Sequence, residues 1–121
     1  MINRILIVDD ELILCNALRY HLLNKGYEVE ISTCYQEFQK KINTGQFDLM
    51  LLDLHLNDIE GLDLLKIARQ ISSEMKIIMV SSYLDQNNIS MAKELGAYEC
   101  VRKNSQMFQV LDQIIETIEA Q

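Results

Sequence analysis

The chain has 121 residues, of which 49% are hydrophobic and 24% are charged, and it carries a net charge of −7. This length suits one globular domain with a single core, and the composition excludes a disordered chain. The negative charge argues against nucleic acid as a direct partner, because contacts with phosphates need clustered lysine and arginine, and it suits divalent cations or a basic protein surface instead.

The sequence also argues against a membrane or secreted protein. No stretch approaches the roughly 20 apolar residues of a membrane span, and the first residues enter a strand-like run without the features of a secretory signal. The three cysteines, Cys15, Cys34 and Cys100, lie far apart and lack CxxC spacing. We therefore expect free thiols, no disulfide or zinc site, no membrane partner and a cytoplasmic location.

Short apolar runs alternate with helical patterns along the chain. The runs typical of strands cover residues 5–8, 27–31, 49–52, 77–80 and 98–101. The first helical segment repeats leucine every four residues, and the last has an apolar stripe from Met107 to Ile118. Glycines are predicted to end three helices at Gly26, Gly45 and Gly96, and N-caps are predicted at Asp85 and Ser105.

This alternation of five strands and five helices predicts an α/β fold. The middle strands show no polar alternation, so we expect a parallel sheet covered by helices on both faces. Right-handed crossovers then give a doubly wound sandwich. The chain contains no Pro, no repeat and no linker, so residues 1–121 are expected to form a single domain.

Polar residues follow the predicted strands at the end where functional groups of open parallel sheets collect. They are Asp9, Asp10 and Glu11 after the first strand, Asp53 after the third, Ser81 and Ser82 after the fourth, and Lys103 after the fifth. The first and third strands are neighbours in the commonest five-stranded order, so their carboxylates should converge and repel. A hard divalent cation would relieve this repulsion, and Mg²⁺ favours one or two carboxylates together with waters and a phosphate. The site is therefore expected to suit an acceptor carboxylate, its metal ion and a phosphoryl group.

The whole chain resembles the receiver domains of bacterial two-component response regulators, from Asn3 to Glu119. The matching parts are ILIVDDE, LMLLDLHLNDIEGLDLL, KIIMVSS, AKELGA and Lys103. Each part is weak alone, but together, in this order and spacing, they are specific. The resemblance implies a flavodoxin-like doubly wound fold with strand order 2-1-3-4-5 and a role in phosphorelay signal transduction.

The resemblance also implies a role for each site residue. Asp53 is similar to the phosphoacceptor, which takes a phosphoryl group from a sensor histidine kinase or phosphotransfer protein. Asp10 would bind Mg²⁺ directly and Asp9 through water, with Asp53 and the backbone carbonyl of His55 as further ligands. Lys103 would offset charge on the transferring oxygens, and Ser81 would bond the attached phosphoryl group. Such a domain is not an enzyme in the usual sense, although it assists its own phosphorylation and dephosphorylation.

Downstream, the resemblance implies an effector domain or a separate target protein, and it leaves room for a homodimer. Three positions depart from the family pattern: Asn104 replaces the usual Pro after the lysine, Cys100 replaces an aromatic residue, and Ser82 replaces a common Ala. A cis peptide bond before Asn104 would cost about 3 kcal/mol, so we expect this loop to be strained or differently built.

Three other functions are alternatives for this sequence. A haloacid-dehalogenase-type phosphatase would need a second Asp two residues after Asp53, where this chain has His55. A flavodoxin-like cofactor binder would need a glycine- and hydroxyl-rich phosphate loop, whereas the segment VDDEL is anionic. A degenerate receiver, acting as an interaction module without phosphorylation, is the main alternative, and only Asn104 and Cys100 favour it.

Overall fold

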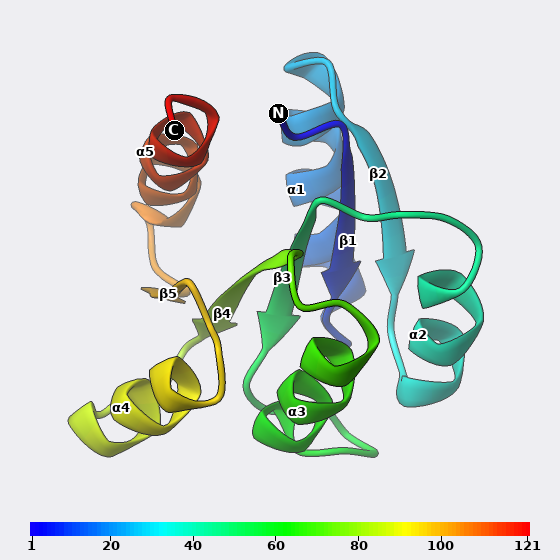
Figure 1. Cartoon of the computed structure of the whole chain (residues 1–121). Coiled ribbons are helices and arrows are strands. Elements are labelled where there is room, and N and C mark those ends of the chain that lie inside the picture. The colour runs from blue at the N-terminus through cyan, green and yellow to red at the C-terminus, as the bar shows by residue number, and fades with distance from the viewer.

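The computed structural model describes residues 1–121 and alternates strands and helices throughout (Figure 1). The strands are β1 (Arg4–Val8), β2 (Glu28–Ser32), β3 (Leu49–Asp53), β4 (Lys76–Ser81) and β5 (Glu99–Arg102). The helices are α1 (Leu12–Asn24), α2 (Tyr35–Ile42), α3 (Gly61–Ile71), α4 (Gln86–Glu94) and α5 (Met107–Glu119). None of these helices has the length and apolarity needed to cross a bilayer.

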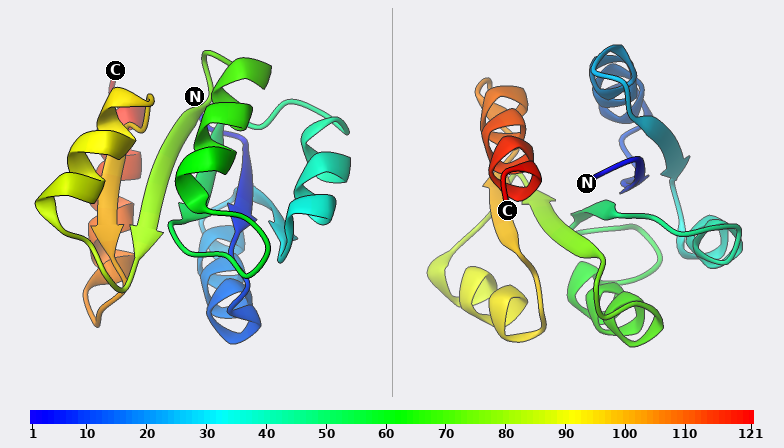
Figure 2. Two further views of the ribbon diagram at one scale, coloured as in Figure 1. Left: turned by 90° about the horizontal axis from the view of Figure 1, so that it is seen from below. Right: turned by 45° about the horizontal axis from the view of Figure 1, so that its top comes forward.

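The five strands form one parallel sheet in the order β2-β1-β3-β4-β5, which confirms the predicted fold class and strand order. Helices α1 and α5 cover one face, and α2, α3 and α4 cover the other (Figure 2). Each face carries its own apolar core, because the side chains of each strand point alternately to the two sides. All five residues of β3 are buried, as expected for the central strand of a sheet covered on both faces.

The predicted strands lie within a residue or two of the observed ones, and the differences have local causes. Tyr27 was expected to begin the second strand, but its N–H donates to the Leu22 carbonyl at 3.3 Å and closes the turn after α1. Asp53 and Ser81 were expected just after their strands and instead are the last residues of β3 and β4. The sheet itself therefore fixes the backbone of both residues.

Two of the three predicted helix-ending glycines are confirmed. Gly26 and Gly96 follow α1 and α4 with φ angles of 97° and 105°, a conformation that L-residues with a side chain rarely adopt. The prediction for Gly45 was wrong: α2 ends earlier, at Ile42, and Gly45 does not have a positive φ.

Of the two predicted N-caps, one is confirmed and one is wrong. Asp85 caps α4, since its carboxylate accepts a hydrogen bond from the Asn88 N–H at 2.7 Å. The prediction for Ser105 was wrong: the Asn104 side chain, one residue earlier, accepts from the Gln106 N–H at 2.9 Å. The N-cap residue of α5 is Gln106, and α5 has no side-chain capping bond. The Asn104 contact instead closes a turn before the helix, so Asn104 has a structural role in a loop where the sequence suggested strain.

Candidate functional site

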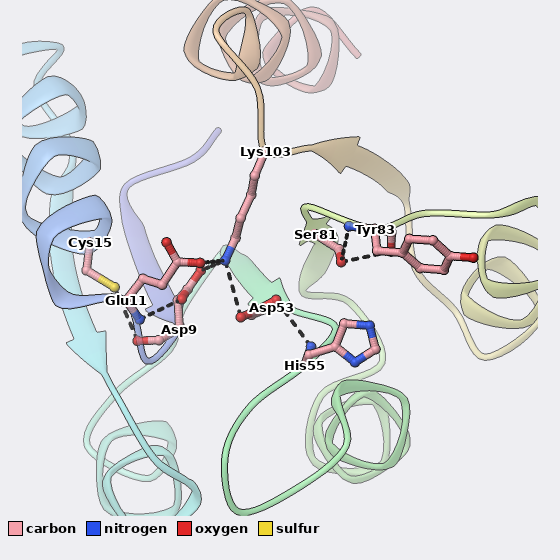
Figure 3. A network of polar contacts seen from close by, with 8 residues as sticks. All are labelled: Asp9, Glu11, Cys15, Asp53, His55, Ser81, Tyr83 and Lys103. Carbon is pink, nitrogen blue, oxygen red and sulfur yellow. Dashed lines mark hydrogen bonds and ion pairs between the residues drawn. The ribbon is translucent and has the colours of Figure 1, made fainter.

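The carboxyl ends of the strands bring the predicted acidic residues together (Figure 3). Asp9 follows β1, which is the neighbour of β3, and Asp53 ends β3 itself. Asp9, Asp10 and Asp53 each offer a carboxylate oxygen within 4.8 Å of the others. Asp9 and Asp53 are both only 5% exposed, so two ionisable groups with little access to solvent lie at the carboxyl ends of β1 and β3.

Lys103 reaches into this group from the end of β5. Its Nζ lies 2.8 Å from Asp9 Oδ2, 2.9 Å from Glu11 Oε1 and 3.2 Å from Asp53 Oδ2. The Lys103 side chain is 9% exposed, so its ammonium group is held almost entirely by carboxylates rather than by water. The structure thus confirms that Lys103 converges on the acidic pair, through a direct contact with both members.

The surroundings shift the ionisation of the central groups. Burial raises the pKa of Asp53, the negative charge of Asp9 adds to that rise, and the His55 N–H and Lys103 oppose it. Burial acts to lower the pKa of Lys103, but its hydrogen bonds to Asp9 and Glu11 outweigh burial, and the net shift is upward. The contacts of Asp53 with the His55 N–H and Lys103 therefore only partly compensate its negative charge, whereas Lys103 beside it stays protonated.

The donor set fits a hard divalent cation. Three carboxylate oxygens at this spacing match the oxygen ligands that Mg²⁺ or Ca²⁺ prefers. The site therefore has the composition of a divalent-metal site.

His55 takes part through its backbone. Its N–H donates to Asp53 Oδ1 at 3.2 Å, while its ring points away from the carboxylates (Figure 3). The ring is 56% exposed, and its Nδ1 lies 3.9 Å from Glu60. The expected metal contact through the His55 carbonyl stays a prediction.

Ser81 does not join the polar network around Asp53. Its hydroxyl donates to the Tyr83 carbonyl at 2.9 Å and accepts from the Tyr83 N–H at 3.1 Å. Figure 3 shows this pair turned away from Asp53 and Lys103, although Ser81 is fully buried at the end of β4. In this structure the Ser81 hydroxyl therefore stabilises the loop that follows β4.

Two residues near the site received no role from the sequence. Glu11 provides the third carboxylate in contact with Lys103. Its position directly after Asp9 and Asp10 is the feature of the sequence that could have indicated this contact. Gly61 begins α3 against the end of β3, and its N–H donates to the Leu54 carbonyl at 2.8 Å. A Cβ there would come within 2.6 Å of Leu54 Cα and closer still to the Asp53 carbonyl oxygen, so only glycine allows this approach.

Known proteins match this arrangement along nearly the whole chain. Residues 5–116 match the response regulator receiver domain family. The chain belongs to this family. As a receiver domain, it is a signal-transduction module of two-component systems, and the alternative of a phosphorylation-independent module is not favoured.

Individual relatives are similar at modest identity. The receiver domain is 32% identical over 103 residues to the alkaline phosphatase synthesis regulator PhoP of Bacillus subtilis, covering 85% of this chain and 43% of PhoP. It is 31% identical to the chemotaxis protein CheY of the same species, over 98% of this chain and 99% of CheY. A CheY-like receiver domain from Methanospirillum hungatei superposes with a TM-score of 0.89 at 34% identity, covering 99% and 96% of the two chains.

The extent of these matches differs between relatives. The receiver domain spans less than half of PhoP and half of the Streptococcus agalactiae regulator DltR, at 43% and 50%, but nearly all of CheY. PhoP and DltR are named as transcriptional regulatory proteins, so in such regulators a receiver accompanies further sequence.

The positions that depart from the family pattern are accommodated locally. Every peptide bond in the receiver domain is trans, including the bond between Lys103 and Asn104, and Lys103 still reaches Asp9 and Asp53. Cys100 is half-buried and packs on the core under α3 and α4. Next to it, Arg102 Nη2 donates to the Leu84 carbonyl at 2.7 Å and joins β5 to the loop after β4.

Proposed function

We propose that Asp53 is the phosphoacceptor of this receiver domain and that a sensor histidine kinase or a phosphotransfer protein is its donor. The observation that carries the proposal is the contact of Lys103 Nζ with Asp53 Oδ2 at 3.2 Å, beside two further aspartates. Asp53 thus combines an incompletely compensated negative charge, which suits a nucleophile, with an adjacent cation that suits an incoming phosphoryl group.

In the proposed transfer, an Asp53 carboxylate oxygen forms a bond to the phosphorus of a phosphohistidine, and the bond between phosphorus and the imidazole nitrogen breaks. The electron pair stays on that nitrogen. The ammonium of Lys103 compensates charge on the phosphoryl oxygens, which is the main help that a protein can give in phosphoryl transfer. In the reverse direction, hydrolysis of the acyl phosphate would restore Asp53.

The cation that fits best is Mg²⁺, and Asp9, Asp10, Asp53 and the His55 carbonyl would hold it. When bound, it would supply positive charge that offsets the charge of the carboxylates and of the phosphoryl group. Asp10 is more exposed than Asp9, whose two oxygens are engaged by Lys103 Nζ and the Glu11 N–H. Because the Asp10 carboxylate is more exposed and the Asp9 oxygens are already engaged, Asp10 is the better candidate for the direct metal ligand and Asp9 for the weaker ligand.

The signal would leave the site through Ser81. To bond a phosphoryl group on Asp53, the Ser81 hydroxyl has to give up its bonds to the Tyr83 carbonyl and N–H. That exchange would reshape the loop between β4 and α4, and with it the surface that a downstream domain or protein reads.

Intact-mass spectrometry with Mg²⁺ and acetyl phosphate tests the acceptor. The wild type should gain one phosphoryl group, and Asp53→Asn should gain none. Asp63→Asn is a matched control, because Asp63 is an exposed carboxylate on α3, and it should behave like the wild type. Equal incorporation in Asp53→Asn and the wild type would overturn the assignment.

A further inference from the structure

Glu11 lies at the outer edge of the proposed phosphorylation site. Its Oε1 is 2.9 Å from Lys103 Nζ, and its own N–H donates to Asp9 Oδ1 at 2.9 Å. The Glu11 side chain is 59% exposed, whereas the side chains of Asp9 and Asp53 are 7% and 6% exposed. Among the carboxylates on Lys103, Glu11 is therefore the one that faces solvent, from which a phosphodonor arrives.

Glu11 also uses a hydrogen-bond donor that the transfer needs. A lysine ammonium has three N–H groups, and Lys103 contacts three carboxylates: Asp9, Glu11 and Asp53. Lys103 donates hydrogen bonds to Glu11 and Asp53, and Asp9 lies 2.8 Å from the same nitrogen. The ammonium is therefore already surrounded by carboxylates, and an incoming phosphoryl oxygen has to displace one of them. Glu11 is the exposed partner, and exposed ion pairs are weak, so it is the partner that yields first.

Substitution of Glu11 should leave the rest of the site in place. Glu11 is outside the group of Asp9, Asp10 and Asp53 whose oxygens lie within 4.8 Å of one another. Lys103 keeps its two buried partners without it. Glu11 is also the N-cap residue of α1, but its side chain makes no capping hydrogen bond, so the helix does not depend on it.

We propose that Glu11 is a specificity-determining residue that slows the capture of small anionic phosphodonors, by repelling the phosphoryl group and by occupying Lys103. Two unit charges about 4 Å apart in water interact strongly enough to change an equilibrium roughly fivefold, and a phosphoryl group carries about two charges that salt partly screens. Removing the Glu11 charge should therefore accelerate phosphorylation by about tenfold. The proposal rests on Asp53 being the phosphoacceptor.

A protein phosphodonor could be attracted by the Glu11 charge, whereas a small anionic donor is repelled by it. A basic side chain beside the phosphohistidine would pair with the Glu11 carboxylate and release Lys103 as the phosphoryl group arrives. Glu11 would thus favour donors that bring their own cation over free acyl phosphates.

The test is the rate of Asp53 phosphorylation by acetyl phosphate at saturating Mg²⁺, followed by intact-mass time courses. The variants are Glu11→Gln, which removes only the charge, Glu11→Ala, which also removes the acceptor, and Glu11→Asp, which keeps the charge. Glu74→Gln is the matched control, because Glu74 is exposed and lies before β4 at the opposite end of the sheet. The same series is repeated at high salt.

Glu11→Gln should react about tenfold faster than the wild type, which corresponds to about 1.4 kcal/mol. Glu11→Ala should react at least as fast as Glu11→Gln, Glu11→Asp should stay close to the wild type, and the gain should shrink at high salt. If Glu11→Gln reacted no faster than the wild type, or if Glu74→Gln gained as much as Glu11→Gln, the proposed role of Glu11 would be overturned. The assignment of Asp53 would still stand. Absence of phosphate on Asp53 in every variant and in the wild type would overturn the proposed function as well.

Discussion

Gly61 should be the least replaceable small residue of the receiver domain, because two backbone segments meet there. A methyl group in Gly61→Ala would come within 2.6 Å of Leu54 Cα and 2.7 Å of the Leu54 carbonyl oxygen. Normal carbon–carbon contacts are about 3.5–4.0 Å, so the start of α3 and the end of β3 have to separate by about 1 Å. Neither backbone can rotate away as a flexible side chain could.

Overpacking of this kind costs about 1–3 kcal/mol, and alanine's better helix propensity, at most about 1 kcal/mol, offsets only part of it. For a domain of this size, a net loss of about 1–2 kcal/mol lowers the melting temperature by about 4–8 °C. The separation would also move Asp53, whose carbonyl oxygen is the nearest atom to the added methyl. The transfer rate from acetyl phosphate should therefore fall along with stability.

Thermal unfolding by circular dichroism and the acetyl phosphate time course measure the two effects. Gly26→Ala is the informative control, because Gly26 has a φ of 97° but no atom within 4 Å of an added Cβ. It should lose stability through backbone strain while keeping its phosphorylation rate. A Gly61→Ala variant with wild-type melting temperature and rate would refute the account of this contact.

Two further predictions concern charge at the site. Asp10→Ala should weaken Mg²⁺ binding at least tenfold, or about 1.4 kcal/mol, in a metal titration, and an unchanged affinity would mean that the ion is held elsewhere. Because the folded-state pKa of Asp53 is raised, chiefly by burial, its ionised form costs stability above that pKa, and the cost disappears as the pH falls towards the ordinary value of 3.8. Metal-free Asp53→Asn should therefore melt higher than the wild type at neutral pH and lose this advantage in acid; a variant that melts lower than the wild type at neutral pH would contradict the shift.

The strands and the strand-end positions of Asp9, Asp53 and Lys103 could be predicted from the sequence, because apolar runs are local patterns. The strand order that brings these residues together is implied by the resemblance to receiver domains and is confirmed by the sheet. The hydrogen-bond partners of individual side chains could not be predicted from the sequence. Ser81 bonds Tyr83 in its own loop, and Asn104 bonds the N–H of Gln106, which is the N-cap residue of α5 in place of Ser105. Both contacts depend on which N–H a turn presents. The Glu11 contact depends on a lysine 92 residues away.

In the proposed switch, a phosphoryl group on Asp53 is read through the Ser81 hydroxyl. Amide-resolved NMR with Mg²⁺, with and without a beryllofluoride mimic of the phosphoryl group, tests it most directly. We expect large shifts across residues 81–88, including the Tyr83 N–H that loses its bond to Ser81, and smaller shifts at Cys100. Shifts that centre on Cys100 and leave residues 81–88 unchanged would contradict it.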